Sequence, residues 1–334
     1  MKVVDMHCDT IAEIYYAQSK GEDVGIRRNS FHVDLEKMKK GDYGIQNFAL
    51  FTSIEREKRP FEYTMNLVDV FYQEMEKNSD LIGVVRSYKD IEENWKAGRM
   101  SALLTIEEGA VCQGKLSYLR DFYRLGVRMM TLLWNHPNEL GYPSCRDTRG
   151  SGSIGTPDTK HGLTETGIAF LEEMERLGMI VDISHLNDAG VWDVLRNTRK
   201  PFVASHSNAR ALTNGCVRNL TDEMIRQMGE RGCVLGINYY PPFLKVPEVG
   251  KEEEKMKSRV CDMVLHMRHI KQVGGIGCIG LGSDFDGIGG DLEMKSCADL
   301  PLLEAEMRKQ GFVESEIEAV FHGNVLRVYR EVLK

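Results

Sequence analysis

Short apolar runs rich in β-branched residues recur along this chain, and stretches with helical periodicity separate most of them. This alternation is typical of parallel strands connected by helices. We predict strands at residues 3–6, 46–51, 102–106, 128–133, 180–183, 202–204, 234–237 and 279–281. Apolar residues three and four apart predict amphipathic helices at residues 63–76, 117–125, 166–177, 188–196, 222–230 and 253–271.

Eight strands with intervening helices fit a closed (β/α)8 barrel of the TIM type better than an open doubly wound sheet. No Gly-x-Gly-x-x-Gly motif follows the first predicted strand, as it would in a dinucleotide-binding sheet. A chain of 334 residues can form one such barrel, so we predict a single α/β domain over residues 1–334. Residues 136–160, rich in Gly, Pro, Ser and Thr, predict a long loop of the kind that often forms a lid.

Composition excludes several classes of partner. The net charge of −7 offers no basic surface for nucleic acid or for an anionic membrane, and no apolar run has the length of a membrane span. Asp5 and Asp9 interrupt the stretch where a signal peptide needs continuous apolar residues. The eight cysteines form no Cys-x-x-Cys pair, which is typical of reduced thiols. We therefore expect a cytoplasmic protein that binds neither nucleic acid nor membrane and that could form a homodimer.

Polar residues gather where the predicted strands end. They follow the first, third, fifth, sixth and eighth strands, and they are His7, Asp9, Glu107, His185, His206 and Asp284. In a parallel barrel these strand ends meet in one mouth, where the active sites of such barrels lie. Strand alternation also puts the first two residues of the set on the same face. We expect all six side chains to lie close together.

A lone histidine after a strand is more often a hydrogen-bonded structural residue than a metal ligand. Here, however, three of the nine histidines occur at the same point of separate strand units, together with carboxylates at the ends of three strands. Packing such desolvated charges without a counter-ion is costly, and a divalent cation removes that cost. Five nitrogen and oxygen ligands exceed the usual set of one catalytic zinc. The sequence therefore predicts two metal ions, whereas His266 and His269 lack a carboxylate partner and are expected to pack or face solvent.

The motifs around these residues resemble those of the membrane dipeptidase (renal dipeptidase) family of zinc metallopeptidases. In chain order they are VDMHCDT, TIEEGA, RLGVRMMTL, IVDISH, PFVASHSNARAL, VRNLTD and GLGSDFDG, and they span nearly the whole chain. The resemblance implies that His7 and Asp9 bind one zinc ion. It further implies that Glu107 bridges both ions and that His185 and His206 bind the second.

The resemblance also implies how substrate is handled. Asp284 corresponds to the catalytic aspartate of the Asp-Phe-Asp motif, and Arg218 corresponds to the arginine that binds the substrate carboxylate. The family's histidine for the scissile carbonyl oxygen aligns with Trp134, so His136 is the candidate for that role. Tyr240 is a further expected substrate-binding residue. Animal members are exported and lipid-anchored, and since neither signal is visible here the chain looks like a bacterial-type cytosolic member.

The expected reaction is hydrolysis of small dipeptides by a hydroxide that bridges the two metal ions beside Glu107. Asp284 would pass the proton of the water to the leaving amine. An alternative is another binuclear amidohydrolase acting on a cyclic amide or a nucleobase. Such enzymes often bridge their metals with a carboxylated lysine after the fourth strand, where this chain has none. A third alternative, a metal-binding or interaction protein without turnover, leaves Asp284 and Arg218 without a function.

Overall fold

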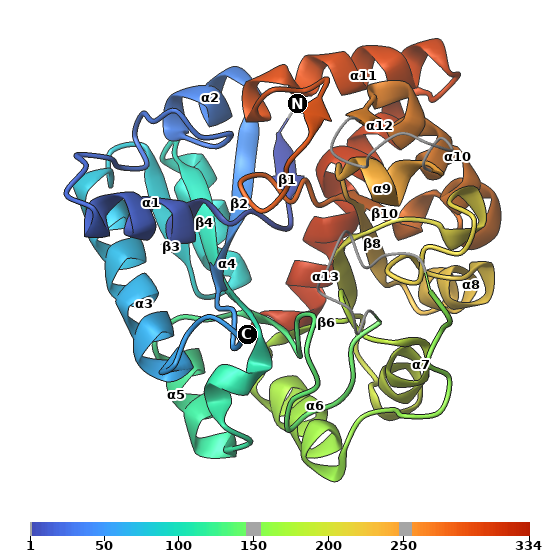
Figure 1. The fold of residues 1–334 in the computed structure, drawn as a ribbon. Helices are drawn as coiled ribbons and strands as arrows, with labels where there is room; N and C mark the ends of the chain where they lie inside the picture. Colours follow the sequence, from blue (N-terminus) through green and yellow to red (C-terminus); the bar gives the residue numbers. More distant parts are fainter. Residues whose placement is uncertain (1, 145–154, 247–255) are drawn as a thin grey trace.

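The structure is a computed structural model, which describes residues 2–144, 155–246 and 256–334. Parallel strands close into a barrel surrounded by helices (Figure 1). Around the barrel the order is β2-β1-β10-β8-β7-β6-β5-β4, and pairing of β4 with β2 closes it. These strands are β1 (Val3–Asp5), β2 (Tyr43–Phe51), β4 (Met100–Glu107), β5 (Met129–Thr131), β6 (Ile180–Asp182), β7 (Val203–Ser207), β8 (Val234–Ile237) and β10 (Ile279–Leu281). The predicted (β/α)8 barrel is confirmed, and each predicted strand overlaps one of these eight.

One described strand of the barrel sheet was not predicted. β3 (Ile82–Val85) pairs with Met100–Leu103, the first half of β4, while β5 pairs with Thr105–Glu107, its second half. β2 pairs with one edge of β4. β3 and β5 therefore pair with the opposite edge of β4, one after the other along its length. An apolar run of this length cannot be told from part of a helix by periodicity alone.

The predicted helices are present, and several others join them. The helices are α1 (Thr10–Ser19), α2 (Leu35–Lys40), α3 (Pro60–Lys77), α4 (Tyr88–Lys96), α5 (Leu116–Arg124), α6 (Glu165–Leu177), α7 (Asp188–Asn197), α8 (Asp222–Glu230), α9 (Pro241–Leu244), α10 (Val260–Gly274), α11 (Leu300–Lys309), α12 (Glu314–Glu318) and α13 (Asn324–Val332). Most lie outside the barrel and bury one apolar face against the strands (Figure 1).

The predicted helix over residues 253–271 begins too early. Residues 253–255 lie outside the described residues, and Lys257–Ser258 forms a short strand, β9, paired with β11 (Asp291–Leu292). α10 starts at Val260, whose N–H donates to Glu293 Oε2 at 2.9 Å. The charged residues before it contribute no apolar face, so this carboxylate, far away in sequence, defines the helix start.

The N-terminal end of the barrel is filled by α13. Val325, Val328 and Tyr329 share one buried cluster with residues that project from the strands, such as Val4 and Ile45. This helix lies near the centre of the view in Figure 1. The opposite end, where the strands terminate, is thereby left for the functional site. None of the described helices combines the length and the apolar character needed to cross a bilayer.

The predicted long loop at residues 136–160 is described only in part. Residues 136–144 and 155–160 contain neither helix nor strand, apart from an isolated bridge between Pro143 and Leu186, and residues 145–154 lie outside the described residues. Its role as a lid stays a prediction.

Candidate metal centre

The predicted ligands lie at or just after the C-terminal ends of the barrel strands, where these ends meet. β1 is paired with β10, and the N–H of Asp284 donates to the carbonyl oxygen of His7 at 3.2 Å. β6 and β7 are also neighbours, and they supply His185 and His206. His185 and Asp284 have positive φ angles of 72° and 62°, a conformation that is uncommon for non-glycine residues.

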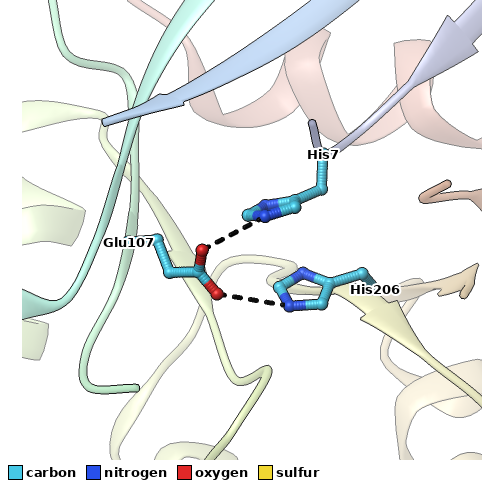
Figure 2. A group of neighbouring side chains, drawn as sticks. All are labelled: His7, Glu107 and His206. Atoms are coloured by element: carbon cyan, nitrogen blue, oxygen red, sulfur yellow. Dashed lines mark ion pairs between the residues drawn. The ribbon is translucent and has the colours of Figure 1, made fainter. Parts of the chain in front are cut away.

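Glu107, the last residue of β4, lies between the histidines. Its Oε2 is 3.3 Å from His7 Nε2, and its Oε1 is 3.0 Å from His185 Nε2 and 3.5 Å from His206 Nε2. Figure 2 shows the carboxylate turned toward His7 with one oxygen and toward His206 with the other. Potential ligand atoms of His7, Glu107 and His206 all lie within 4.8 Å of one another. The same holds for His7, Asp9 and Asp284, so His7 belongs to both groups.

The Nδ1 atoms of His185 and His206 are each held by a neighbouring side chain. Ser205 Oγ donates to the buried carboxylate of Asp182, and it lies 2.7 Å from His206 Nδ1. The serine oxygen therefore accepts from Nδ1–H, which leaves the lone pair of Nε2 directed at the centre. Asn135 Oδ1 lies 2.9 Å from His185 Nδ1 and has the same effect. Both rings present a bare Nε2 toward Glu107.

Burial also keeps these two rings neutral. It lowers the pKa of His185 to about 4, and the nearby positive charge of Arg218 acts in the same direction. Burial and the charge of His7 hold the pKa of His206 well below its usual range. A neutral imidazole is the form that binds metal. The two Nε2 atoms are 3.0 Å apart, so a shared cation would remove the repulsion between their lone pairs.

Negative charge is concentrated on the other side of Glu107. Burial and the nearby charge of Glu107 together raise the pKa of Asp9 to about 6. Burial alone would lower the pKa of His7, but Glu107 and Asp9 outweigh it and raise that pKa well above its usual value. Burial would likewise raise the pKa of Glu107, yet His7 and the other histidines hold it well below its ordinary value.

The chemistry of this set fits divalent metal ions. Within the described residues, His7 Nδ1, His7 Nε2 and Asp9 Oδ1 are buried and make no hydrogen bond. Leaving such atoms without partners is costly, and a cation would satisfy them. Imidazole nitrogens and carboxylate oxygens together are ligands that zinc accepts.

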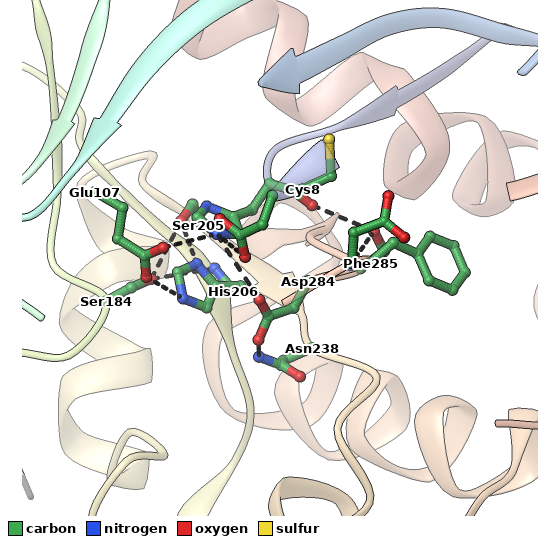
Figure 3. Close-up of polar contacts among 12 residues, drawn as sticks. Cys8, Glu107, Ser184, Ser205, His206, Asn238, Asp284 and Phe285 are labelled. Carbon is green, nitrogen blue, oxygen red and sulfur yellow. Dashed lines mark hydrogen bonds and ion pairs between the residues drawn. The ribbon is translucent and has the colours of Figure 1, made fainter. Parts of the chain in front are cut away.

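Asp284 is held differently from the other carboxylates. Its Oδ2 accepts a hydrogen bond of 2.8 Å from Asn238 Nδ2, a contact visible in Figure 3. Its Oδ1 points the other way and lies 3.8 Å from His7 Nε2. Burial raises the pKa of Asp284 to about 7; the charge of His7 opposes that rise, and Asp9 and Glu107 reinforce it. A carboxylate with a pKa near neutrality can both take and give a proton.

Arg218 lies in a loop, yet only 3% of its surface is exposed. It therefore lies inside the protein rather than at its surface. Its guanidinium lies over the ring of Phe243 at 5.4 Å from the ring centre. Its charge lowers the pKa of both His185 and His206. Tyr240 is half-buried and packs its ring at 5.0 Å from Phe243. Arg218 and Tyr240 therefore both pack against Phe243, close to the candidate metal ligands.

His136 packs against the ring of Trp134 and lies near the carboxylate of Glu55, and its role in carbonyl binding stays a prediction. Its ring is 5.9 Å from that of Trp134, which in turn is 6.2 Å from the ring of His185. Its Nε2 lies 3.5 Å from Glu55 Oε2. Of the two candidates for the family's position after β5, Trp134 is thus the one that contacts a predicted ligand.

His266 and His269 lie on α10 and contact neighbouring elements, and the expected lack of a carboxylate partner is wrong for His269. His266 is buried, accepts from the N–H of Ala209 and lies 2.9 Å from the carbonyl oxygen of Leu244. His269 pairs with Asp222 at 2.7 Å. They therefore connect α10 to neighbouring loops and to α8.

Several of the described residues that support the site were not predicted, among them two asparagines and one aspartate. Asp182, Asn135 and Asn238 contact Ser205, His185 and Asp284 through hydrogen bonds. The one signal available in the sequence is that Asp182 and Asn135 occur beside predicted strand ends. Their partners depend on how adjacent strands are placed, which periodicity does not reveal.

The model of the membrane dipeptidase family, peptidase family M19, matches residues 1–334. The chain belongs to this family. An uncharacterized dipeptidase of Schizosaccharomyces pombe is 31% identical over 313 residues, which cover 90% of this chain and 72% of that protein. The predicted class of enzyme, a metal-dependent dipeptidase, is confirmed. The match favours it over the alternatives of a cyclic-amide or nucleobase hydrolase and of a protein without turnover.

Two solved structures share the whole fold. Dipeptidase AC, a metallopeptidase of family M19, has a TM-score of 0.88 at 26% identity, and the match covers 100% of this chain and 99% of that one. A metallopeptidase of Rhodobacter sphaeroides, solved with a phosphinate mimic of the dipeptide L-Ala-D-Ala, has a TM-score of 0.89 at 25% identity, with 99% of each chain covered.

Proposed function

We propose that this chain hydrolyses the peptide bond of dipeptides at a binuclear zinc site held by His7, Asp9, Glu107, His185 and His206. The observation that carries this proposal is the position of Glu107, whose two oxygens face different histidines at 3.0 and 3.3 Å. A carboxylate between two sets of ligands is suited to bridge a pair of ions. We further propose that residues 1–334 act as one domain.

When bound, the two ions would supply a water molecule of lowered pKa and a Lewis acid for the peptide carbonyl. Asp284 accepts the proton of this water on Oδ1, because Oδ2 is already occupied by the hydrogen bond from Asn238. It then returns the proton to the leaving amine, so the carboxylate is restored after each turnover. The buried position of Asp284 excludes bulk water, which supports this exchange.

Arg218 binds the C-terminal carboxylate of the dipeptide. Its planar guanidinium can donate two parallel hydrogen bonds to a carboxylate. Tyr240 and Phe243 lie on the same side of the site and would contact the substrate's C-terminal residue. His136, which packs against Trp134, is a further proposed substrate contact.

The test is a hydrolysis screen on purified protein with measured metal content. We expect about two equivalents of zinc, turnover of free dipeptides and slow turnover of the same dipeptides carrying a C-terminal amide. Removal of metal with a chelator should abolish hydrolysis, and addition of zinc should restore it. Full activity of metal-free protein, or turnover of cyclic amides but not of dipeptides, would contradict the proposal.

A further inference from the structure

An arginine and an aspartate form a close ion pair beside the loop that carries Arg218. Arg210 Nη1 donates to Asp188 Oδ2 at 2.8 Å, and Arg210 Nη2 donates to Asp188 Oδ1 at 2.6 Å. Only 11% and 10% of the two side chains are exposed. The bidentate geometry and the burial separate this pair from the exposed ion pairs on the helices, which contribute little.

The same guanidinium also holds the backbone on both sides of Arg218. Arg210 Nε donates to the carbonyl oxygen of Asn219 at 2.8 Å, and its Nη2 donates to that of Val217 at 3.1 Å. Ser207 Oγ donates to the carbonyl oxygen of Arg218 itself at 2.9 Å. The carbonyl groups of three consecutive residues are thereby fixed, with Arg218 in the middle.

The base of the loop is closed by backbone contacts. The N–H of Arg210 donates to the carbonyl oxygen of Leu220 at 2.8 Å, and the N–H of Leu220 donates to that of Asn208 at 2.9 Å. Asp188 belongs to α7, so its pairing with Arg210 also ties this loop to the helix that follows β6. The loop therefore has two supports, one at its base and one beside Arg218.

Only arginine can make this set of contacts. Its rigid fork of five N–H groups reaches one carboxylate and two carbonyl oxygens at once, whereas lysine offers a single point charge. Residues that hold a substrate must be fixed to within a fraction of an ångström, since small displacements cost large factors in rate.

We propose that Arg210, braced by Asp188, is a positioning residue for Arg218 and thereby a determinant of the preference for substrates with a free C-terminal carboxylate. This inference rests on the proposed role of Arg218 in binding that carboxylate. A purely structural role for the pair would affect all substrates alike. The positioning role affects only those substrates that carry the carboxylate.

The test compares kcat/KM for one dipeptide and for its C-terminal amide. The proteins are the wild type, Arg210→Lys, Arg210→Met, Arg218→Met and the double variant Arg210→Met/Arg218→Met. The control is Arg196→Met, which breaks an exposed Arg–Asp pair on α7, the helix that also carries Asp188. Metal content and thermal unfolding of each variant are measured first.

We expect Arg210→Lys and Arg210→Met to lower the preference for the free dipeptide by a factor on the order of 10 to 100, mainly through KM. Turnover of the amide should change little. In the Arg218→Met background, Arg210→Met should lower the preference no further, because both residues act through one contact. Arg196→Met should behave as the wild type. Arg210→Lys keeps a positive charge opposite Asp188, so it tests the inference even if Arg210→Met fails to fold.

Two results would overturn the inference in different ways. A wild type that does not distinguish the free dipeptide from its amide would remove the role of Arg218, and with it the function of Arg210. A wild type that does distinguish them, combined with an Arg210→Lys variant of unchanged preference, would refute the positioning role alone. Equal losses on both substrates would likewise assign the Arg210–Asp188 pair to fold stability.

Discussion

Asp284 presents its two carboxylate oxygens to different surroundings. Oδ2 is held by Asn238, whose own Oδ1 accepts from the N–H of Tyr240 at 2.6 Å, so the amide is fixed at both ends. Oδ1 faces His7 across 3.8 Å. One oxygen therefore serves orientation and leaves the other for proton transfer.

The variant Asp284→Asn separates proton transfer from metal binding. It keeps the shape of the side chain but removes its ability to accept a proton, so turnover should fall by a factor of about 10² to 10⁴. Metal content should stay at the wild-type level, because the five proposed ligands are intact. Steady-state kinetics and metal analysis of the same preparation measure both. Loss of one equivalent of metal would make Asp284 a ligand, as its place near His7 and Asp9 allows.

At the scale of elements, the pairing of β6 with β7 explains why His185 and His206 act together. The register places Asp182 opposite Val203. The Asp182 carboxylate accepts from the N–H groups of Ser184 and Ser205 at 3.0 and 2.8 Å. This buried carboxylate ties the ends of the two strands together, one residue before each histidine. The two rings are consequently presented as a unit.

We therefore expect His185→Ala and His206→Ala each to lower the metal content from about two equivalents toward one. Both rings are proposed to bind the same ion, and a site that loses a ligand binds its ion more weakly. His269→Ala is the control, because this half-buried histidine on α10 pairs with Asp222 and should not affect metal content. Retention of two tightly bound ions by His206→Ala would show that the ligand assignment is wrong.

The site residues that could be predicted from the sequence are those at the ends of the strands. His7, Glu107 and His206 each follow a recognisable apolar run, and parallel strands in a barrel bring such ends together. The structure agrees with that expectation because topology alone determines it.

The residues that were missed depend on finer placement. Asn135 and Asn238 lie in loops, and their partners are set by the path of the backbone. Glu108, which follows the strand, turns away with φ of 101° and accepts from Asn138 Nδ2 and from the N–H of Trp134. Such contacts carry no periodic signal. The same limitation applies to the position after β5, where Trp134 lies beside His185 and the role of His136 stays a prediction.

At the scale of the whole molecule, the two ends of the chain complete the barrel. β1 is the strand that joins β2 to β10, and α13 fills the opening at the N-terminal ends of the strands. Tyr329 on α13 is fully buried, and its hydroxyl donates to Asn47 Oδ1 on β2 at 2.8 Å. The functional site lies at the other end of the strands. The buried contacts of α13 and the candidate site therefore lie at opposite ends of the barrel.

This separation predicts that substitutions at Tyr329 weaken folding without impairing catalysis. Tyr329→Ala should lower the free energy of unfolding by about 3–5 kcal/mol, the usual cost of removing a large buried ring. Tyr329→Phe should cost about 1–3 kcal/mol, because it leaves Asn47 Oδ1 buried without its donor. Leu302→Ala, at a side chain on α11 that is 47% exposed, is the control and should change stability by less than about 0.5 kcal/mol.

Urea denaturation of the four proteins measures these differences, and kcat/KM for a free dipeptide is determined on the folded fraction at low temperature. The value of kcat/KM should be the same in all four proteins. Among the described residues, the hydroxyl of Tyr329 donates to Asn47 and not to any of the proposed metal ligands. A Tyr329→Phe variant that is fully stable but has lost activity would show that α13 influences the strand ends, and that the two ends of the barrel are coupled.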